Sequence, residues 1–157
     1  RGRRGRGARG PRLNDGLEGL SIVKPPYGVL TALDINSGEL LFQVPHGDTT
    51  DDVRATLERL GIDYPEKAGQ GYSVGLMVTK TLVILGDPRV TSPPGRERGA
   101  MLRPYDKMTG EEVGAVWMPT AQICSPMTYM IDGRQYIIVA VSGGNYSGEY
   151  IAYALPE

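Results

Sequence analysis

One turn pattern occurs twice in this chain, and its repetition limits the folds that the chain can adopt. LDINSGEL at 33–40 and YDKMTGEE at 105–112 share an Asp, then a Ser or Thr three positions later, then Gly-Glu. In such a turn the Asp side chain accepts backbone N–H bonds two residues on, and the Gly supplies the positive φ that closes the loop. Each copy stands between stretches rich in β-forming residues. Each therefore predicts a hairpin, and the recurrence predicts a repeat architecture.

A third, truncated copy ends the chain and sets the period. YIAYALP at 150–156 aligns with LTALDIN, which places Ala152 opposite Ala32 and Pro104. The last two copies stand 48 residues apart, whereas the first two stand 72 residues apart. The excess of 24 residues equals the length of 46–69, the only stretch with a helical pattern. We interpret this stretch as an insertion into a repeat of about 48 residues and expect its helix within 49–61.

Two further hairpins are predicted between these turns, across Lys80-Thr81 and across Asp132-Gly133. Each unit then holds four antiparallel strands, the pattern of a β-propeller blade, so the predicted fold class is all-β. A sandwich of similar strand count stays possible, but it would not require the turn to recur in frame. We expect the outer half of a blade at 27–45, a helical insertion at 46–71, a full blade at 72–118, and a last blade without its fourth strand at 123–155.

The chain stops where that fourth strand would begin, and it does not start with Met. We therefore expect the C-terminal end of an incomplete ring, within a propeller fragment at 15–157, with unpaired sheet edges. Residues 1–14 are rich in Arg and Gly and cannot bury apolar surface, so we expect a disordered tail. The tail has no aromatic residue that could stack on bases, and we do not expect a nucleic-acid partner. No apolar run reaches the roughly 18 residues of a membrane span.

The turn pattern resembles the tryptophan-docking repeat of quinoprotein dehydrogenases, eight-bladed propellers that use pyrroloquinoline quinone. PMTYMIDGRQYIIVAVSGG at 126–144 resembles the final blade of the membrane-bound glucose and quinate dehydrogenase branch, and the stretch at 24–48 resembles an earlier passage of that family. The aromatic residue expected four positions after the turn Gly is Phe42 in the first copy. In the second copy that position is Gly114, and Trp117 stands three residues later.

The resemblance implies a quinone funnel at one end of the ring axis, lined by loops of every blade. The loop SGGNYSG at 142–148 is one of these, so Gly143, Gly144 and Asn145 are the predicted cofactor contacts: glycines let a flat ligand approach, and Asn can donate and accept hydrogen bonds. The alternative is a plain connecting loop. GQGYSVG at 69–75 is a second candidate for the funnel wall, and a strand rather than a helix follows its Gly-x-Gly, which excludes a dinucleotide cradle.

The resemblance further implies a divalent cation such as calcium or magnesium and a catalytic aspartate, both expected in blades outside this chain. We assign no catalytic and no metal-binding residue here. The implied partners are the missing N-terminal blades, a small alcohol or sugar substrate, and a quinone or cytochrome as electron acceptor. The implied location is the periplasm, with an inner-membrane anchor in a missing N-terminal part as one option.

Other polar or reactive residues receive structural interpretations. His46, the only histidine, is expected in a surface turn, and Cys124 is expected to be a small buried side chain. Asp48, Asp51 and Asp52 are expected to favour the N-terminus of the helix electrostatically. The leading hypothesis is the C-terminal part of a quinoprotein dehydrogenase, inactive as a fragment; the alternative is a non-catalytic propeller that scaffolds protein assembly.

Overall fold

The repeated turn forms in both places as the sequence predicts. In the computed structural model, which describes residues 18–154, Asp34 Oδ1 accepts hydrogen bonds from the N–H groups two and three residues on, at 2.8 and 3.2 Å. Asp106 Oδ1 accepts the two equivalent bonds at 2.8 and 2.9 Å. Each turn therefore closes a hairpin through the same side-chain contacts.

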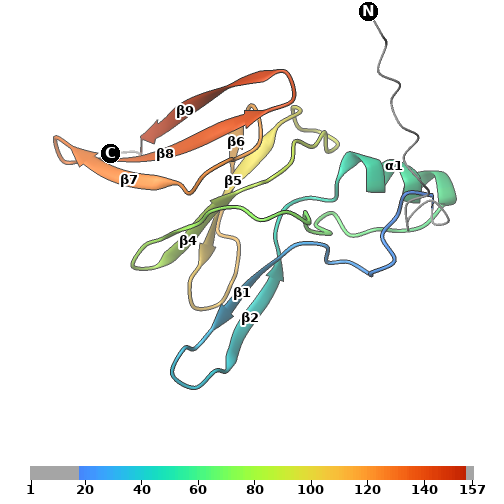
Figure 1. Cartoon of the computed structure of the whole chain (residues 1–157), viewed down its shortest axis with the longest axis horizontal. Helices are drawn as coiled ribbons and strands as arrows, with labels where there is room; N and C mark the ends of the chain where they lie inside the picture. The colour runs from blue at the N-terminus through green and yellow to red at the C-terminus, as the bar shows by residue number, and fades with distance from the viewer. Residues whose placement is uncertain (1–17, 155–157) are drawn as a thin grey trace, which may run out of the picture.

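The strands form three separate antiparallel sheets (Figure 1). The first sheet consists of β1 (Val29–Leu33) and β2 (Leu40–Pro45). The middle sheet consists of β3 (Met77–Val78), β4 (Leu82–Gly86), β5 (Ala100–Asp106) and β6 (Val116–Met118), in that order. The last sheet consists of β7 (Met127–Ile131), β8 (Arg134–Gly143) and β9 (Tyr146–Ala154). The prediction of an all-β chain with antiparallel sheets is confirmed for the described residues.

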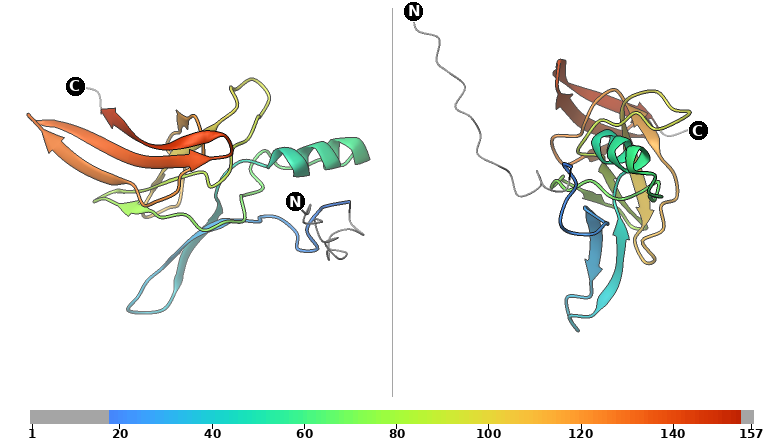
Figure 2. Two further views of the ribbon diagram at one scale, coloured as in Figure 1. Left: turned by 45° about the horizontal axis from the view of Figure 1, so that its top comes forward. Right: turned by 90° about the vertical axis from the view of Figure 1, so that its right-hand side faces the viewer.

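The middle sheet packs on a neighbour with each of its faces, because successive side chains of a strand point to opposite sides. Ile84 and Leu102 belong to an apolar cluster shared with the last sheet, which contributes Val139 and Val141. Neighbouring positions on β4 and β5 face the other way, toward the first sheet. That second cluster consists of Leu30, Val83, Leu85 and Tyr105, with Phe42, Val44 and Val74 packed against it. The three sheets fan out like neighbouring blades (Figures 1 and 2).

One contact between the first two sheets involves the aromatic residue of the turn repeat. A Cβ on Gly110, in the turn that joins β5 to β6, would lie 2.5 Å from Cδ2 of Phe42. The Phe42 ring therefore lies directly on the turn glycine of the next sheet. The region of Gly114 and Trp117 differs, since Trp117 packs instead against Gly99, the residue before β5.

The helix α1 (Asp51–Leu60) lies within the predicted range 49–61 and is the only helix among residues 18–154. Gly61 ends it, with its N–H directed to Glu58 O. The helix lies beyond one end of the sheets and covers none of their faces (Figure 2). The connection between β4 and β5 and the β8–β9 turn lie toward this same end (Figure 1).

Cys124 is exposed, so the prediction of a buried cysteine is wrong. The connection between β6 and β7 directs Gln122 inward instead, where Oε1 accepts from Gly86 N–H and Nε2 donates to Gly75 O, both at 2.6 Å. A polar side chain with two backbone partners thus occupies the interior position, and Cys124 is turned to solvent. The predicted tail, 1–14, lies outside the described residues. Within residues 18–154 no helix combines the length and apolarity needed to cross a membrane.

Candidate functional site

The predicted cofactor contacts lie in the turn between β8 and β9. Gly143 ends β8 and pairs with Tyr146 at the start of β9, so only Gly144 and Asn145 form the turn itself. The predicted loop 142–148 is therefore a tight hairpin whose outer residues belong to the strands. A Cβ on Gly144 would have no heavy atom within 4 Å, which leaves open space beside the turn.

This turn forms one wall of a hollow of about 650 Å³ at the helix end of the sheets. The structure brings Gly143, Gly144 and Asn145 together there. The rest of the lining comes from the β4–β5 connection, from the segment after β6 and from the first residue of β9. These lining residues are Pro88, Arg89, Val90, Arg98, Pro119, Thr120, Ala121 and Tyr146. Among the lining residues the only charged side chains are the two arginines, Arg89 and Arg98.

The two arginines are held by carboxylates of α1. Arg98 Nη1 donates to Asp51 Oδ2 at 2.9 Å and to Ser92 Oγ at 2.9 Å. Arg89 Nη2 lies 3.4 Å from Asp52 Oδ2. Both arginine side chains remain partly exposed, 39% for Arg89 and 64% for Arg98. The pairs therefore hold the β4–β5 connection against the helix without removing the guanidinium groups from solvent.

One of these carboxylates, that of Asp51, also fixes the backbone of the β4–β5 connection. Asp51 Oδ1 accepts from Ser92 N–H at 2.8 Å, and Arg54 Nη2 donates to Ser92 O at 2.7 Å. Burial raises the pKa of Asp51, but the bonds from Ser92 and Arg54 outweigh it and hold this pKa below its ordinary value. Asp51 and Asp52 do stand in the first helical turn, as predicted. Besides Arg54 of the same helix, their partners include arginines of the β4–β5 connection, which the helix-terminus interpretation did not foresee.

The second predicted wall segment, 69–75, lines a neighbouring hollow of about 490 Å³ through Gly69, Gly71 and Tyr72. Arg89 lines both hollows. Gly69 is required by packing, because a Cβ there would collide with the backbone of Gly28. The Gly-x-Gly pattern in this stretch thus marks a close crossing of two backbone segments.

His46 is buried, 4% exposed, so the prediction of a surface turn histidine is wrong. Its Nε2 lies 3.1 Å from Gly86 O, which can only accept, so Nε2 carries the proton and donates. Nδ1 then accepts from the Tyr105 hydroxyl at 2.9 Å. Burial lowers the pKa of His46 and outweighs the negative charge of Asp87, which acts to raise this pKa. The histidine is therefore a neutral structural group that joins the end of β2 to the middle sheet.

Arg103, 1% exposed, is the centre of a buried ion-pair network beside His46. Its Nε donates to Asp87 Oδ1 at 2.7 Å, and its Nη1 donates to Glu112 Oε1 at 3.0 Å. Its Nη2 lies 2.9 Å from Asp48 Oδ1, and Asp48 also pairs with Arg96. Burial acts to lower the pKa of Arg103, but Asp87 and the other two carboxylates outweigh it and raise this pKa.

This network corrects the interpretation of Asp48, which precedes α1 and pairs with Arg96 and Arg103 rather than serving the helix N-terminus. The sequence offered one signal for it. Arg103 alternates with Leu102 and lies on the same strand face as Tyr105, so its side chain points into a core. A charge at such a position requires buried partners.

No group of three or more His, Cys, Asp or Glu side chains in the described part of the chain is arranged to hold a metal ion.

Comparison with known proteins finds a matching family model and several curated relatives. A family model described as PQQ glucose/ethanol/alcohol dehydrogenase, beta-propeller domain, matches residues 7–137. Quinate/shikimate dehydrogenase (quinone) of Acinetobacter baylyi is 28% identical over an alignment of 149 residues, and the match covers 88% of this chain and 17% of that protein. Quinoprotein glucose dehydrogenase of Escherichia coli is 26% identical over an alignment of 148 residues, and the match again covers 88% of this chain and 17% of the relative.

The glycerol dehydrogenase large subunit of Gluconobacter thailandicus is 26% identical over an alignment of 149 residues, and the match covers 91% of this chain and 19% of that subunit. The chain thus spans less than a fifth of the length of these curated relatives. No solved structure matches it.

Proposed function

The chain belongs to the beta-propeller family of PQQ-dependent glucose, ethanol and alcohol dehydrogenases, and on this premise we propose that it is the C-terminal part of a quinoprotein dehydrogenase. The intact enzyme oxidises an alcohol or a sugar. The observation that carries the proposal is the family match over residues 7–137. We assign part of the cofactor site to the hollow beside the β8–β9 turn.

The three sheets are blades of an eight-bladed ring. The first sheet is the outer half of a blade, with the insertion 46–71 after it, and the middle sheet is a complete blade. The last sheet lacks its fourth strand. The remaining blades belong to the part of the relatives that this chain does not span, which is more than four fifths of their length.

The hollow is suited to pyrroloquinoline quinone, which is flat and carries carboxylates. Its wall at Gly143 and Gly144 has no side chains, so a flat ring can approach the backbone, and its lining contains arginines and no acid. Asn145 supplies an amide that can donate to or accept from the ring substituents. These three residues form part of the cofactor wall, and loops of the other blades supply the rest.

A bound quinone would supply the hydride acceptor for oxidation of the substrate alcohol to a carbonyl compound, and the substrate hydroxyl would give its proton to a base. The residues of this chain hold and orient the ring and exclude water from one side of it. We assign the base, and the ligands of a divalent cation such as calcium or magnesium, to the blades outside this chain.

The electron acceptor is a quinone or a cytochrome, and the enzyme works in the periplasm. The names of relatives support both acceptors: one is a quinate/shikimate dehydrogenase (quinone), and another, from Thauera butanivorans, is a 1-butanol dehydrogenase (cytochrome c). An inner-membrane anchor, if the enzyme has one, belongs to the N-terminal part.

The test is quinone titration and dye-linked dehydrogenase activity of the intact protein with Asn145→Phe, compared with Asn36→Phe. Both asparagines lie in hairpin turns, but Asn36 is exposed in the β1–β2 turn, away from the hollow. Asn145→Phe should weaken quinone retention at least tenfold, because the ring would fill the space that the cofactor needs, and Asn36→Phe should leave it unchanged. Equal retention in both variants would exclude this turn from the quinone site. Failure of the unmodified intact protein to bind quinone would contradict the proposed function as a whole.

A further inference from the structure

We propose that Thr120 is a further binding residue of the hollow and that its hydroxyl donates a hydrogen bond to an oxygen of the quinone. The inference rests on the proposed function, since it concerns the cofactor of the same site. No sequence pattern singles out this residue. The structure does so, because Thr120 lines the hollow from the segment that joins β6 to β7.

The Thr120 side chain is buried, and its hydroxyl has no partner in the described part of the chain. The residue is 2% exposed, and no hydrogen bond joins its hydroxyl to any residue within 18–154. Buried polar side chains are nearly always hydrogen-bonded, so a buried hydroxyl without a partner requires an explanation. The part of Thr120 that is still accessible lies on the wall of the hollow. A ligand in the hollow is therefore within reach of this hydroxyl.

The segment that carries Thr120 is fixed on two sides. Ala121 O accepts from Ser142 N–H at 3.0 Å, which joins the segment to β8. Gln122 N–H donates to Asp87 O at 3.1 Å, which joins it to the residue after β4. Threonine is branched at Cβ, so its χ1 angle has few accessible rotamers. The hydroxyl is therefore held in place before a ligand arrives, which lowers the entropic cost of binding.

The hydroxyl also lies beside the glycine wall of the hollow. A Cβ on Gly143 would lie 3.2 Å from Thr120 Oγ1, whereas a Cβ on Gly144 would meet no heavy atom within 4 Å. A flat ring that approaches these glycines therefore comes close to the hydroxyl. Thr120 is also far less exposed than Arg89 and Arg98 of the same lining. This depth favours a ligand that stays in the hollow, the cofactor, over a substrate that enters and leaves.

The chemistry of the hydroxyl suits a quinone. Carbonyl and carboxylate oxygens only accept hydrogen bonds, and a threonine hydroxyl can donate one. The competing explanation is that Thr120 only fills space in the wall. Thr120→Val separates the two explanations, because valine has nearly the same shape and lacks the hydroxyl.

The first experiment is calorimetric titration of the quinone-free intact protein with pyrroloquinoline quinone, in the unmodified form and in three variants. Thr120→Val should weaken binding about tenfold through the loss of one hydrogen bond. Thr120→Ser keeps the hydroxyl and should bind within about threefold of the unmodified protein. Thr91 is 1% exposed, as buried as Thr120, but lies outside the lining, so Thr91→Val should leave the affinity unchanged.

Urea unfolding of the quinone-free variants distinguishes a binding role from a structural one. A hydroxyl without a partner in the protein does not stabilise the fold, so Thr120→Val should not lower the urea midpoint. A lower midpoint together with normal quinone affinity would assign the hydroxyl to the fold and overturn the inference.

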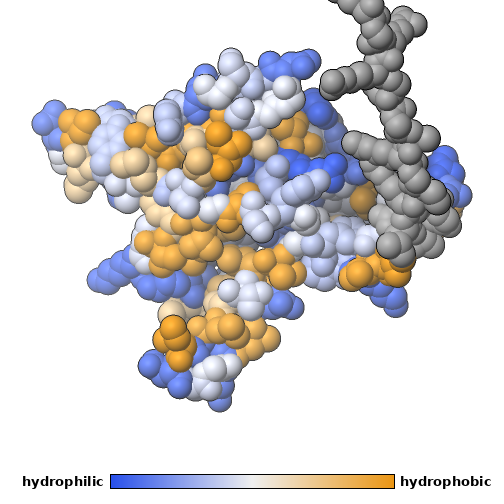
Figure 3. Space-filling view, viewed as in Figure 1, coloured by the Kyte–Doolittle hydropathy of each residue, from blue (hydrophilic) through white to orange (hydrophobic). Residues whose placement is uncertain are grey.

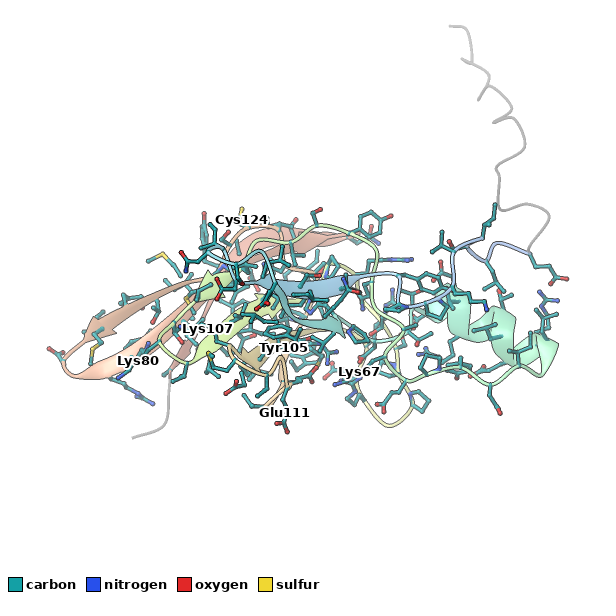
Figure 4. All side chains as sticks on the ribbon, turned by 90° about the horizontal axis from the view of Figure 1, so that it is seen from below. Lys67, Lys80, Tyr105, Lys107, Glu111 and Cys124 are labelled. Atoms are coloured by element: carbon teal, nitrogen blue, oxygen red, sulfur yellow. The ribbon has the colours of Figure 1, made fainter. Side chains whose placement is uncertain are left out.

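Thiol labelling tests the contact independently of affinity. In Thr120→Cys the new thiol should react with methyl methanethiosulfonate in the quinone-free intact protein and should be protected at saturating quinone. The native Cys124 is the internal control, since it is exposed, does not line the hollow and lies away from the helix end of the molecule (Figure 4). Peptide mass spectrometry measures both positions, and the labelling of Cys124 should be the same with and without quinone.

Unchanged quinone affinity in Thr120→Val, with no protection in Thr120→Cys, would overturn the inference and leave the proposed function standing. A raised KM for the substrate at unchanged quinone affinity would assign the hydroxyl to the substrate and would also overturn it. Failure of the unmodified intact protein to bind quinone would overturn the proposed function and this inference together.

Discussion

At the scale of single residues, His46 is held neutral by its surroundings, and this predicts how stability depends on pH. Burial lowers its pKa in the folded protein, whereas in the unfolded chain it titrates near its ordinary value of 6.5. As the pH falls below about 6.5, the unfolded chain takes up a proton that the folded protein does not, so the free energy of unfolding decreases until the folded pKa is reached. Above pH 6.5 this residue contributes no pH dependence.

His46→Gln should remove this part of the pH dependence. It should also cost about 1–3 kcal/mol at neutral pH, because Gly86 O or the Tyr105 hydroxyl loses its partner. Urea unfolding of the intact protein and of the variant, at a series of pH values from 5 to 8, measures both effects. An unchanged slope below pH 6.5 in the variant would show that another group is responsible.

His46 and Arg103 also show what the sequence could not predict at this scale. Their environment consists of partners far away in the chain, such as Gly86 and Tyr105 for His46. The sequence around His46 indicates that this residue follows a strand. Whether it is buried depends on which other sheet packs against that strand, and the neighbouring residues in the sequence do not show this. Cys124 is the converse case, since Gln122 takes the inward position through two backbone bonds that no local pattern reveals.

At the scale of elements, the hairpins were predictable because turn chemistry is local. Asp34 and Asp106 make the same pair of bonds, and Asp132 and Gly133 both adopt positive φ, at 50° and 79°, as their turn requires. The contact between elements was only partly predictable. The aromatic residue Phe42 was expected four positions after the turn glycine. Its contact with Gly110 of the following sheet depends on how the two sheets pack, which the local sequence does not show.

Gly110→Ala and Gly133→Ala form a matched pair that tests this contact. Both glycines have similar positive φ, 74° and 79°, so both variants incur about 1–2 kcal/mol of backbone strain. Only at Gly110 would the added methyl group also collide with the Phe42 ring, since nothing lies within 4 Å of a Cβ on Gly133. Gly110→Ala should therefore lower the free energy of unfolding by about 1–3 kcal/mol more than Gly133→Ala.

Urea unfolding of the two variants in the intact protein measures this difference. Phe42→Leu supplies the internal check, because it should reduce the extra cost of Gly110→Ala if the ring is its cause. Equal costs at the two glycines would mean that the ring moves aside freely and does not fix the position of the sheets.

At the scale of the whole molecule, apolar side chains remain exposed on both outer sheets. On the first sheet these include Val29, Leu33, Leu40 and Leu41, and on the last sheet Met127, Met130, Ile131 and Tyr150. Apolar surface gathers on the β1–β2 hairpin at the lower end of Figure 3. Such surface beside unpaired strand edges promotes association.

The isolated 157-residue chain should therefore self-associate, and it should neither hold the quinone tightly nor oxidise alcohols or sugars, since the proposed site needs groups from the other blades. Light scattering, quinone titration and the dye-linked assay, performed on the chain and on the intact protein side by side, check this expectation. Turnover by the chain alone would contradict the proposed division of the site between this chain and the other blades.

The middle sheet has two faces of different chemistry, and their response to temperature differs accordingly. The contact with the last sheet is mainly apolar, through residues such as Ile84, Leu102 and Val139, whereas the contact with the first sheet includes the buried Arg103 network. Apolar contacts weaken on cooling, and the desolvation penalty of ion pairs falls on warming. Both contacts contain an apolar cluster, and among the described residues only the contact with the first sheet adds an ion pair, between Asp48 and Arg103. We therefore expect cooling to weaken the contact with the last sheet more than the contact with the first sheet.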